Sequence, residues 1–362
     1  MSVSDNILFF LCLSARGGAE ISMIRLAQGL LLSGRSVTLV VYGTMPFLAQ
    51  ELGFQGDVIT LKRKRTVSTI FPLWNILRKK RFATIVSALT HTNMAALIAA
   101  RLSLRSINTL VTEHGSDGLM ACASSRLFSC VTRLIYERAS AVITVSKNLE
   151  QSWRQILSSK SLITTVYNPV VDESFSQTVL PLHPWLLQQN TPVIMGIGRL
   201  KPEKNFSLLV RAFARLVLKR EARLIILGEG EERAALEKLA YELDVKERVL
   251  LPGFVSDVPT WLAQAALLVC PSEREGFGNV VVEALACGVS VVATDCPGPA
   301  EILENGRYGR LTPRDDVNAM AQAINETLEN KKDPEILRGR AQNFTVTRCV
   351  DDYITLIDTL SS

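Results

Sequence analysis

The chain has 362 residues, which is too long for one compact core of ordinary size and predicts two domains. Its residues are 48% hydrophobic and 21% charged, which excludes a chain that is disordered over most of its length. The net charge is a modest +5. The seven cysteines are scattered without a C-x-x-C pair, and this pattern argues against a disulfide framework or a zinc site and favours a reducing, cytoplasmic compartment.

The first apolar segment, residues 7–13, is short enough to imitate the core of a signal peptide. No positively charged segment precedes it, and Asp5 stands there instead, so we expect these residues to form the first buried strand. No uncharged apolar run reaches the roughly 18 residues of a transmembrane helix. We therefore expect a soluble protein that is at most peripheral on the inner face of the cytoplasmic membrane.

Short apolar runs alternate with helical patterns along the rest of the chain. The predicted strands are residues 7–13, 36–42, 85–88, 109–113, 141–145, 192–196, 223–227, 249–251, 267–270 and 290–293. Apolar residues recur at helical spacing between them, most clearly at 22–32, 206–218, 231–242 and 317–328. Buried strands that alternate with helices are typical of parallel sheets, so the sequence predicts an α/β protein with two doubly wound domains.

A domain boundary is expected between Asn168 and Thr191, because a turn signal and several prolines interrupt the pattern there. We predict a first domain over residues 1–175 and a second over residues 176–345. Residues 346–362 are apolar at helical spacing again, so a terminal helix should pack against another part of the chain.

Two turns carry glycines between a predicted strand and a predicted helix. Gly17 and Gly18 follow the first strand and could admit an anion to a helix N terminus, although a turn that needs glycine for packing explains them equally well. In the second half, Gly198 is followed by Arg199 and Lys204, two cations that suit a diphosphate. A solvated basic turn is the alternative. Neither segment has the spacing of a dinucleotide-binding fingerprint.

Two carboxylates, Glu275 and Glu283, bracket a turn that contains two glycines. Glycines form helices poorly, so we expect a loop that carries Glu275 and then a helix that carries Glu283. A helix start of this kind binds anions, and a phosphorylated sugar would use the carboxylates on either side for its hydroxyls. The chain has no D-x-D motif, which argues against a metal, and we expect no cofactor.

Together these segments resemble the family 4 retaining glycosyltransferases over nearly the whole chain. The resemblance is carried by Gly17-Gly18-Ala19-Glu20, by Gly198-Arg199-Leu200 with Glu203-Lys204-Asn205, and by the Glu-x7-Glu element from Glu275 to Glu283. It implies a GT-B fold, in which two Rossmann-like domains face each other across a cleft and a C-terminal helix returns to the first domain. The first domain would bind the acceptor and the second the nucleotide-sugar donor.

The resemblance also implies roles for single residues. Arg199 and Lys204 would hold the donor diphosphate, Glu275 would contact hydroxyls of the transferred sugar, and Glu283 would bind the ribose. The other residues that it places around the donor, as backbone contacts or beside the base, are Gly17, Gly18, Gly198, Phe254, Val255, Phe277, Gly278 and Asn279.

Three histidines are present in the chain. His114 follows a predicted strand, and the resemblance implies that it faces the anomeric centre, so we expect it near the reacting atoms. A structural histidine that caps the strand is the alternative. His91 has a similar position and is left open, and His183 is expected to be structural.

Two basic runs flank the apolar segment 66–77. The runs consist of Lys62, Arg63, Lys64 and Arg65 and of Arg78, Lys79, Lys80 and Arg81. Cations beside apolar residues suit an anionic membrane surface. Solvated loop ends, with the apolar residues packed inward, are the alternative. Nucleic acid is a poorer fit, because the net charge is modest and few aromatics lie between the cations.

The residues and the resemblance predict a retaining, metal-independent glycosyltransferase. It would move a hexose or N-acetylhexosamine from a nucleotide diphosphate sugar to a saccharide or polyprenyl-linked saccharide during synthesis of a cell-surface glycan such as exopolysaccharide, O-antigen or lipopolysaccharide. Residues 296–303 resemble the loop of members that use UDP-sugars, so UDP is favoured over GDP. The alternatives are a nucleotide-sugar epimerase of the same architecture, whose acid and base carboxylates are not evident, and a non-catalytic nucleotide-sugar-binding protein.

Overall fold

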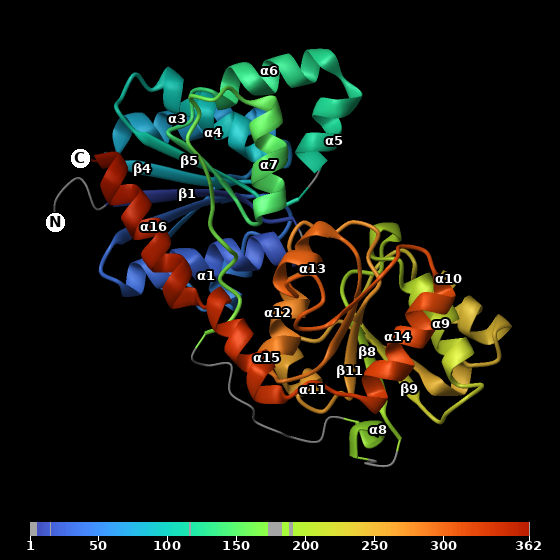
Figure 1. Cartoon of the computed structure of the whole chain (residues 1–362). Helices are drawn as coiled ribbons and strands as arrows, with labels where there is room; N and C mark the ends of the chain where they lie inside the picture. The colour runs from blue at the N-terminus through green and yellow to red at the C-terminus, as the bar shows by residue number, and fades with distance from the viewer. Residues whose placement is uncertain (1–5, 15, 116, 173–182, 188–190, 362) are drawn as a thin grey trace. The chain divides into compact units, whose positions relative to one another are not determined.

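The computed structural model describes residues 6–14, 16–115, 117–172, 183–187 and 191–361 and divides into two compact units (Figure 1). Unit 1 comprises Met1–Val170 and Phe344–Ser362, and unit 2 comprises Val171–Asn343. The expected domain limit at residue 175 lies outside the described residues, so the predicted domain ranges stay a prediction.

Unit 1 is built on a parallel sheet of seven strands in the order β3-β2-β1-β4-β5-β6-β7. The strands are β1 (Asn6–Cys12), β2 (Ser36–Tyr42), β3 (Asp57–Thr60), β4 (Thr84–Ala88), β5 (Asn108–Glu113), β6 (Ala141–Thr144) and β7 (Ile163–Thr165). The apolar segment near the N terminus forms β1, which pairs on both sides with other strands. The prediction that it is a buried strand is therefore confirmed.

Helices cover both faces of this sheet. They are α1 (Gly18–Leu32), α2 (Leu48–Glu51), α3 (Ile70–Lys79), α4 (Thr90–Leu102), α5 (Asp117–Ser124), α6 (Arg126–Tyr136), α7 (Lys147–Ile156) and α16 (Val346–Ser361), with a 3-10 turn η2 (Thr66–Thr69). Successive side chains of β1 point to opposite faces. Phe9 packs in one core with α1 and α16, and Phe10 packs in another with α3 and α4.

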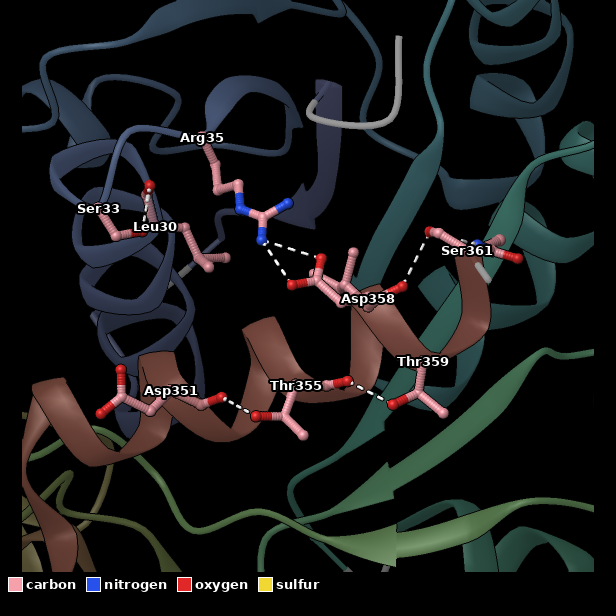
Figure 2. A network of polar contacts seen from close by, with 10 residues as sticks. Leu30, Ser33, Arg35, Asp351, Thr355, Asp358, Thr359 and Ser361 are labelled. Carbon is pink, nitrogen blue, oxygen red and sulfur yellow. Dashed lines mark hydrogen bonds and ion pairs between the residues drawn. The ribbon is translucent and has the colours of Figure 1, made fainter. Parts of the chain in front are cut away.

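The C-terminal helix α16 docks on α1, as Figure 2 shows for its last turns. The Arg35 guanidinium donates to both carboxylate oxygens of Asp358, at 2.9 and 2.8 Å. The helices approach closely at Gly29, where an added Cβ would lie 2.5 Å from a methyl group of Val350. The expected return of a terminal helix to the first half of the chain is confirmed.

Unit 2 is built on a parallel sheet of six strands in the order β10-β9-β8-β11-β12-β13. The strands are β8 (Val193–Ile197), β9 (Arg223–Leu227), β10 (Val249–Gly253), β11 (Leu267–Cys270), β12 (Val291–Thr294) and β13 (Arg310–Thr312). The helices are α8 (Pro184–Leu187), α9 (Phe206–Leu216), α10 (Arg233–Glu242), α11 (Val258–Leu262), α12 (Asn279–Ala286), α13 (Pro297–Ile302), α14 (Val317–Glu329) and α15 (Pro334–Ala341). The 3-10 turns are η3 (Pro202–Lys204), η4 (Lys246–Arg248) and η5 (Gln342–Phe344), the last of which ends where the chain re-enters unit 1.

All ten predicted strands form, and the two doubly wound parallel sheets are those expected from the sequence. Three strands were not predicted, namely β3, β7 and β13, and each lies at an edge of its sheet. Within the described part of the chain, no helix combines the length and the apolar character needed to cross a membrane.

Candidate functional site

The two loops that carry most of the expected donor residues meet at one point of the unit 2 sheet. Strands β8 and β11 are neighbours, but the chain continues from β8 toward β9 and from β11 toward β12 on the opposite side. Such a reversal leaves the carboxyl ends of the two strands open, and open α/β sheets bind ligands there. The loops touch through their backbones, because the Glu273 N–H donates to the Glu203 carbonyl at 3.0 Å.

The loop after β8 brings Lys204 to this point. Gly198 follows the strand, and Lys204 ends the 3-10 turn η3, with one residue between it and the start of α9. Asn205 adopts a left-handed conformation with a φ of 47° and caps α9 with its side chain, which also donates to an Asp315 carboxylate oxygen at 2.6 Å. This role of Asn205 was not predicted from the sequence. Its place just before an apolar helical run is the usual signal of a cap.

The loop after β11 carries Glu275 and leads into α12, which carries Glu283, as the sequence predicted. Gly278 precedes the helix with a φ of 104°, a conformation that strongly favours glycine. Phe277 is buried at 2% exposure, and its backbone packs closely against Gly298. Asn279 begins the helix. The first turn of α12 therefore follows directly after the Glu275 loop.

The two loops are joined by an ion pair between the Lys204 ammonium and the Glu275 carboxylate. The side chains are 22% and 15% exposed, so the pair is largely but not fully shielded from water. Burial has the largest single effect on Lys204 and lowers its pKa, but the opposing interactions, chiefly with the Glu275 carboxylate, leave the net pKa above its ordinary value. Beneath the pair, burial together with Glu275 raises the pKa of Cys270 to about 11, so this residue stays a neutral thiol.

The remaining expected donor residues of unit 2 surround this pair less closely. Arg199 is exposed, and its positive charge is near enough to lower the pKa of Lys204. Phe254 follows β10 with 52% of its surface exposed, and Val255 is half-buried. The structure thus brings Lys204 and Glu275 into direct contact, whereas the residues expected at the base lie on the loop that follows β10.

In unit 1, the glycine turn lies at the corresponding reversal of strand order, between β1 and β4. Gly17 is the cap residue of α1 and Gly18 its first residue. The Gly17 carbonyl accepts from the Ile21 N–H at 3.1 Å, which begins the helical hydrogen bonding. The N terminus of α1 therefore lies where doubly wound sheets bind ligands, and the Glu20 carboxylate lies against Gly17 there.

His114 follows β5 and is half-buried in unit 1. Its Nε2 atom lies 3.0 Å from the Thr112 hydroxyl, and that hydroxyl donates its own proton to the Ser87 carbonyl at 2.9 Å. When that proton is given to Ser87, Thr112 accepts from a ring that carries its proton on Nε2. Burial lowers the pKa of His114 to about 4, against an opposing contribution from Asn168. The ring is thus neutral at physiological pH.

A buried polar network, which the sequence analysis did not predict, lies beside His114. The Glu113 carboxylate is 2% exposed and accepts from Tyr136, from Asn93 at 3.0 Å and from Thr90 at 2.9 Å. Burial and the neighbouring Glu113 raise the pKa of Tyr136 well above its usual range, so the phenol keeps its proton. The only sequence signal was the presence of polar residues inside two apolar helical patterns.

The other expected positions are more peripheral. His91 lies exposed in the first turn of α4. The His183 ring accepts from the Trp185 N–H at 3.2 Å, which fits the structural role expected for it. A surface hollow of about 440 Å³ lies between β13 and α14 and is lined by Arg310 and Glu326, away from the Lys204 loop. Among the residues that the structure describes, no three side chains of the His, Cys, Asp or Glu type gather as a metal site requires.

The basic runs lie on the surface of unit 1. All eight cations are exposed, and Leu73 and Leu77 of α3 point into the core. Phe71 is 70% exposed and packs at a tilt against Trp74, and the Arg78 guanidinium covers that indole at 5.1 Å. The helix therefore buries one apolar face and exposes aromatic surface next to its cations.

Comparison with known proteins gives two family matches, which together span most of the chain. A sequence family described as "Glycosyltransferase Family 4" matches residues 16–174, and one described as "Glycosyl transferases group 1" matches residues 183–344. The first coincides largely with unit 1 and the second with unit 2.

Curated relatives are similar over part of their length. The N-acetylgalactosamine-N,N'-diacetylbacillosaminyl-diphospho-undecaprenol 4-alpha-N-acetylgalactosaminyltransferase of Campylobacter jejuni is 35% identical over 59% of this chain and 57% of its own length. The lipopolysaccharide core biosynthesis glycosyltransferase LpsE of Rhizobium meliloti is 37% identical over 46% of this chain and 50% of its own. The chain thus spans only about half the length of each of these relatives.

Solved structures share the architecture over almost the whole chain. The Anabaena protein Alr3699/HepE in complex with UDP and glucose superposes with a TM-score of 0.81 at 23% identity, covering 98% of this chain and all of that one. At this identity the likeness establishes the fold.

Proposed function

Because this chain belongs to the family 4 glycosyltransferases and has their GT-B architecture, we propose that it transfers a hexose or N-acetylhexosamine from a UDP-sugar to a saccharide or lipid-linked saccharide. The product would be part of a cell-surface glycan. Two relatives support this acceptor class, since one is named for a diphospho-undecaprenol-linked acceptor and the other for the lipopolysaccharide core. UDP as the nucleotide is supported by the Anabaena complex and by the loop at residues 296–303.

The observation that carries the proposal is the meeting of Lys204 and Glu275 where the strand order of unit 2 reverses. Lys204 and the nearby Arg199 would neutralise the donor diphosphate. Glu275 would accept hydrogen bonds from hydroxyls of the transferred sugar, and Glu283 on α12 would accept those of the ribose. The backbone of residues 277–279 and the start of α12 would face the phosphates or the sugar.

The chemistry follows from these positions. The bond between the anomeric carbon and the diphosphate oxygen breaks, and its electrons leave with UDP. Lys204 and Arg199 stabilise that charge as it forms, which is usually the largest contribution to such a reaction. The acceptor hydroxyl attacks the same face and gives its proton to the departing phosphate, so that the anomeric configuration is retained. The absence of a D-x-D motif supports metal-independent departure.

For unit 1 we propose that His114 takes part near the reacting atoms and that Gly17 and Gly18 admit the diphosphate. The ring would meet a bound sugar as an uncharged group, because burial holds the pKa of His114 below the physiological range. It would not serve as a cation toward the phosphates.

We further propose that the two basic runs, residues 62–65 and 78–81, bind the protein to an anionic membrane, where a lipid-linked acceptor is presented. Each cation near such a surface contributes about 1 kcal/mol. Exposed Phe71 supplies the apolar contact. A variant with glutamine at residues 62–65 should co-sediment less with anionic liposomes at low salt than the wild type. A Lys331→Gln/Lys332→Gln variant of unit 2 should bind like the wild type, and equal losses in both would contradict the proposal.

A release assay tests the reaction itself. The protein is incubated with UDP-glucose, UDP-galactose, their N-acetylated forms and GDP-mannose, and free nucleoside diphosphate is measured over time. A transferase releases UDP slowly to water from its own donor and faster when an acceptor is supplied. An epimerase would instead yield an isomeric nucleotide sugar without UDP, and a non-catalytic binding protein would yield neither product.

A further inference from the structure

The Lys204–Glu275 ion pair affects the relative affinity of the site for the donor and for the nucleoside diphosphate product. Both side chains are largely shielded, and they come from loops that are also held together by the backbone contact between Glu273 and Glu203. The Glu275 carboxylate is paired with the ammonium and, of the groups that raise the pKa of Lys204, it contributes most. Any diphosphate that uses Lys204 must therefore displace this carboxylate or sit next to it.

A free nucleoside diphosphate and its sugar ester differ in charge. The terminal phosphate has a second pKa of about 6, so the free diphosphate carries about one more negative charge than the ester at neutral pH. Lys204 and Arg199 alone would therefore favour the product over the donor. A carboxylate in the same site opposes both anions, and it opposes the more highly charged product more strongly.

We infer that Glu275 is the resting counter-ion of Lys204 and weakens the binding of the bare nucleoside diphosphate relative to the donor, which speeds the release of product. The inference rests on the proposed function. Sugar hydroxyls of the donor hydrogen-bond to Glu275 and offset its repulsion of the phosphates. Once the sugar has been transferred, those hydroxyls are gone and the carboxylate pairs with Lys204 again.

The test measures dissociation constants for UDP by isothermal titration calorimetry. Glu275→Gln keeps the size of the side chain and removes its charge, and it should bind UDP about five- to tenfold more tightly than the wild type. The same variant should bind the donor identified in the release assay no more tightly than the wild type does. Inhibition of turnover by added UDP should become correspondingly stronger.

Two controls separate the pair from a general charge effect. Glu273→Gln removes one charge from the same loop and should leave the UDP affinity unchanged. In a Lys204→Met background, Glu275→Gln should lose most of its gain, because the partner is missing. An equal gain in Glu273→Gln, a gain that persists without Lys204, or unchanged or weaker UDP binding by Glu275→Gln would each overturn the inference and leave the proposed function standing. Failure of the wild type and all variants to bind UDP would overturn both.

Discussion

The two units share a sheet architecture, but the polar groups at the ends of their strands differ in their exposure to water and in the charge of their partners. In unit 1, Glu113 is 2% exposed and is satisfied by neutral donors of the surrounding helices. In unit 2, Lys204 and Glu275 form a charged pair whose side chains are 22% and 15% exposed. A buried network of this kind fixes one arrangement, because every lost hydrogen bond leaves an unsatisfied group. A pair that solvent and ligand can reach is able to exchange partners.

The residues of the unit 1 network therefore stabilise the fold, whereas the residues of the unit 2 pair are accessible to a ligand. Changes in the unit 2 pair should act mainly on binding and turnover, and changes in the unit 1 network should act mainly on stability.

The largest effect is expected for Lys204→Met. Loss of the ammonium should lower kcat/KM on the order of 100-fold, because the departing diphosphate loses its main cation. UDP affinity should fall as well, while the thermal unfolding midpoint changes little. Steady-state kinetics and calorimetry measure these quantities. Lys219→Met, which removes an exposed lysine after α9, is the matched control, and a normal UDP dissociation constant in Lys204→Met would contradict the prediction.

The neutral state of His114 predicts a pH dependence of stability. Its pKa is about 4 in the folded protein, against an ordinary value of 6.5, so only the unfolded chain takes up the proton as the pH falls through this window. The contribution of His114 is complete above pH 6.5 and should decrease by about 2 kcal/mol by pH 5. Urea unfolding of the wild type and of His114→Gln at several pH values isolates this contribution. Parallel pH profiles for the two proteins would refute it.

A smaller loss is expected for Tyr136→Phe, which removes one donor to Glu113 without changing the packing. The free energy of unfolding should fall by about 1 to 2 kcal/mol, because a buried carboxylate loses a hydrogen bond. Hydrogen exchange should become faster in β5, which locates the effect in unit 1. Tyr241→Phe alters a tyrosine that is 72% exposed and serves as the control. Equal free energies of unfolding for the two variants would show that the hydrogen bond from Tyr136 to Glu113 contributes little stability.

The smallest effect is expected for Arg35→Ala, which breaks the pair with Asp358 shown in Figure 2. Arg35 is 18% and Asp358 53% exposed, so the pair should contribute at most about 1 kcal/mol. By contrast, Gly29→Leu inserts a side chain where α1 and α16 are in contact and should destabilise more strongly. Thermal unfolding of the two variants shows whether the ion pair or the helix packing contributes more to the docking of α16 on α1.

The sequence predicted every central strand but, of the four edge strands, only β10. Central strands are buried on both faces and appear as continuous apolar runs, such as β9 and β11. The missed strands β3, β7 and β13 have partly or fully exposed residues, so their sequences lack such a run.

The candidate site shows the same limit. The resemblance pointed separately to Lys204 and Glu275, but not to their contact, because the two residues are 71 positions apart in the sequence. They meet because β8 and β11 are neighbours in the sheet, and spacing along the chain does not encode that order. The Glu113 network was missed because its partners come from β5, α4 and α6, whose packing likewise depends on the tertiary fold.

The docking of α16 on α1 has a consequence for the order of synthesis. Unit 2 is one continuous stretch, Val171–Asn343, and its core can close as soon as that stretch has left the ribosome. Unit 1 begins first but needs Cys349, Val350, Tyr353 and Ile357 to complete one of its cores. The half of the protein that is made first is therefore the half that is finished last, and until then α1 exposes an apolar surface that a chaperone would have to shield.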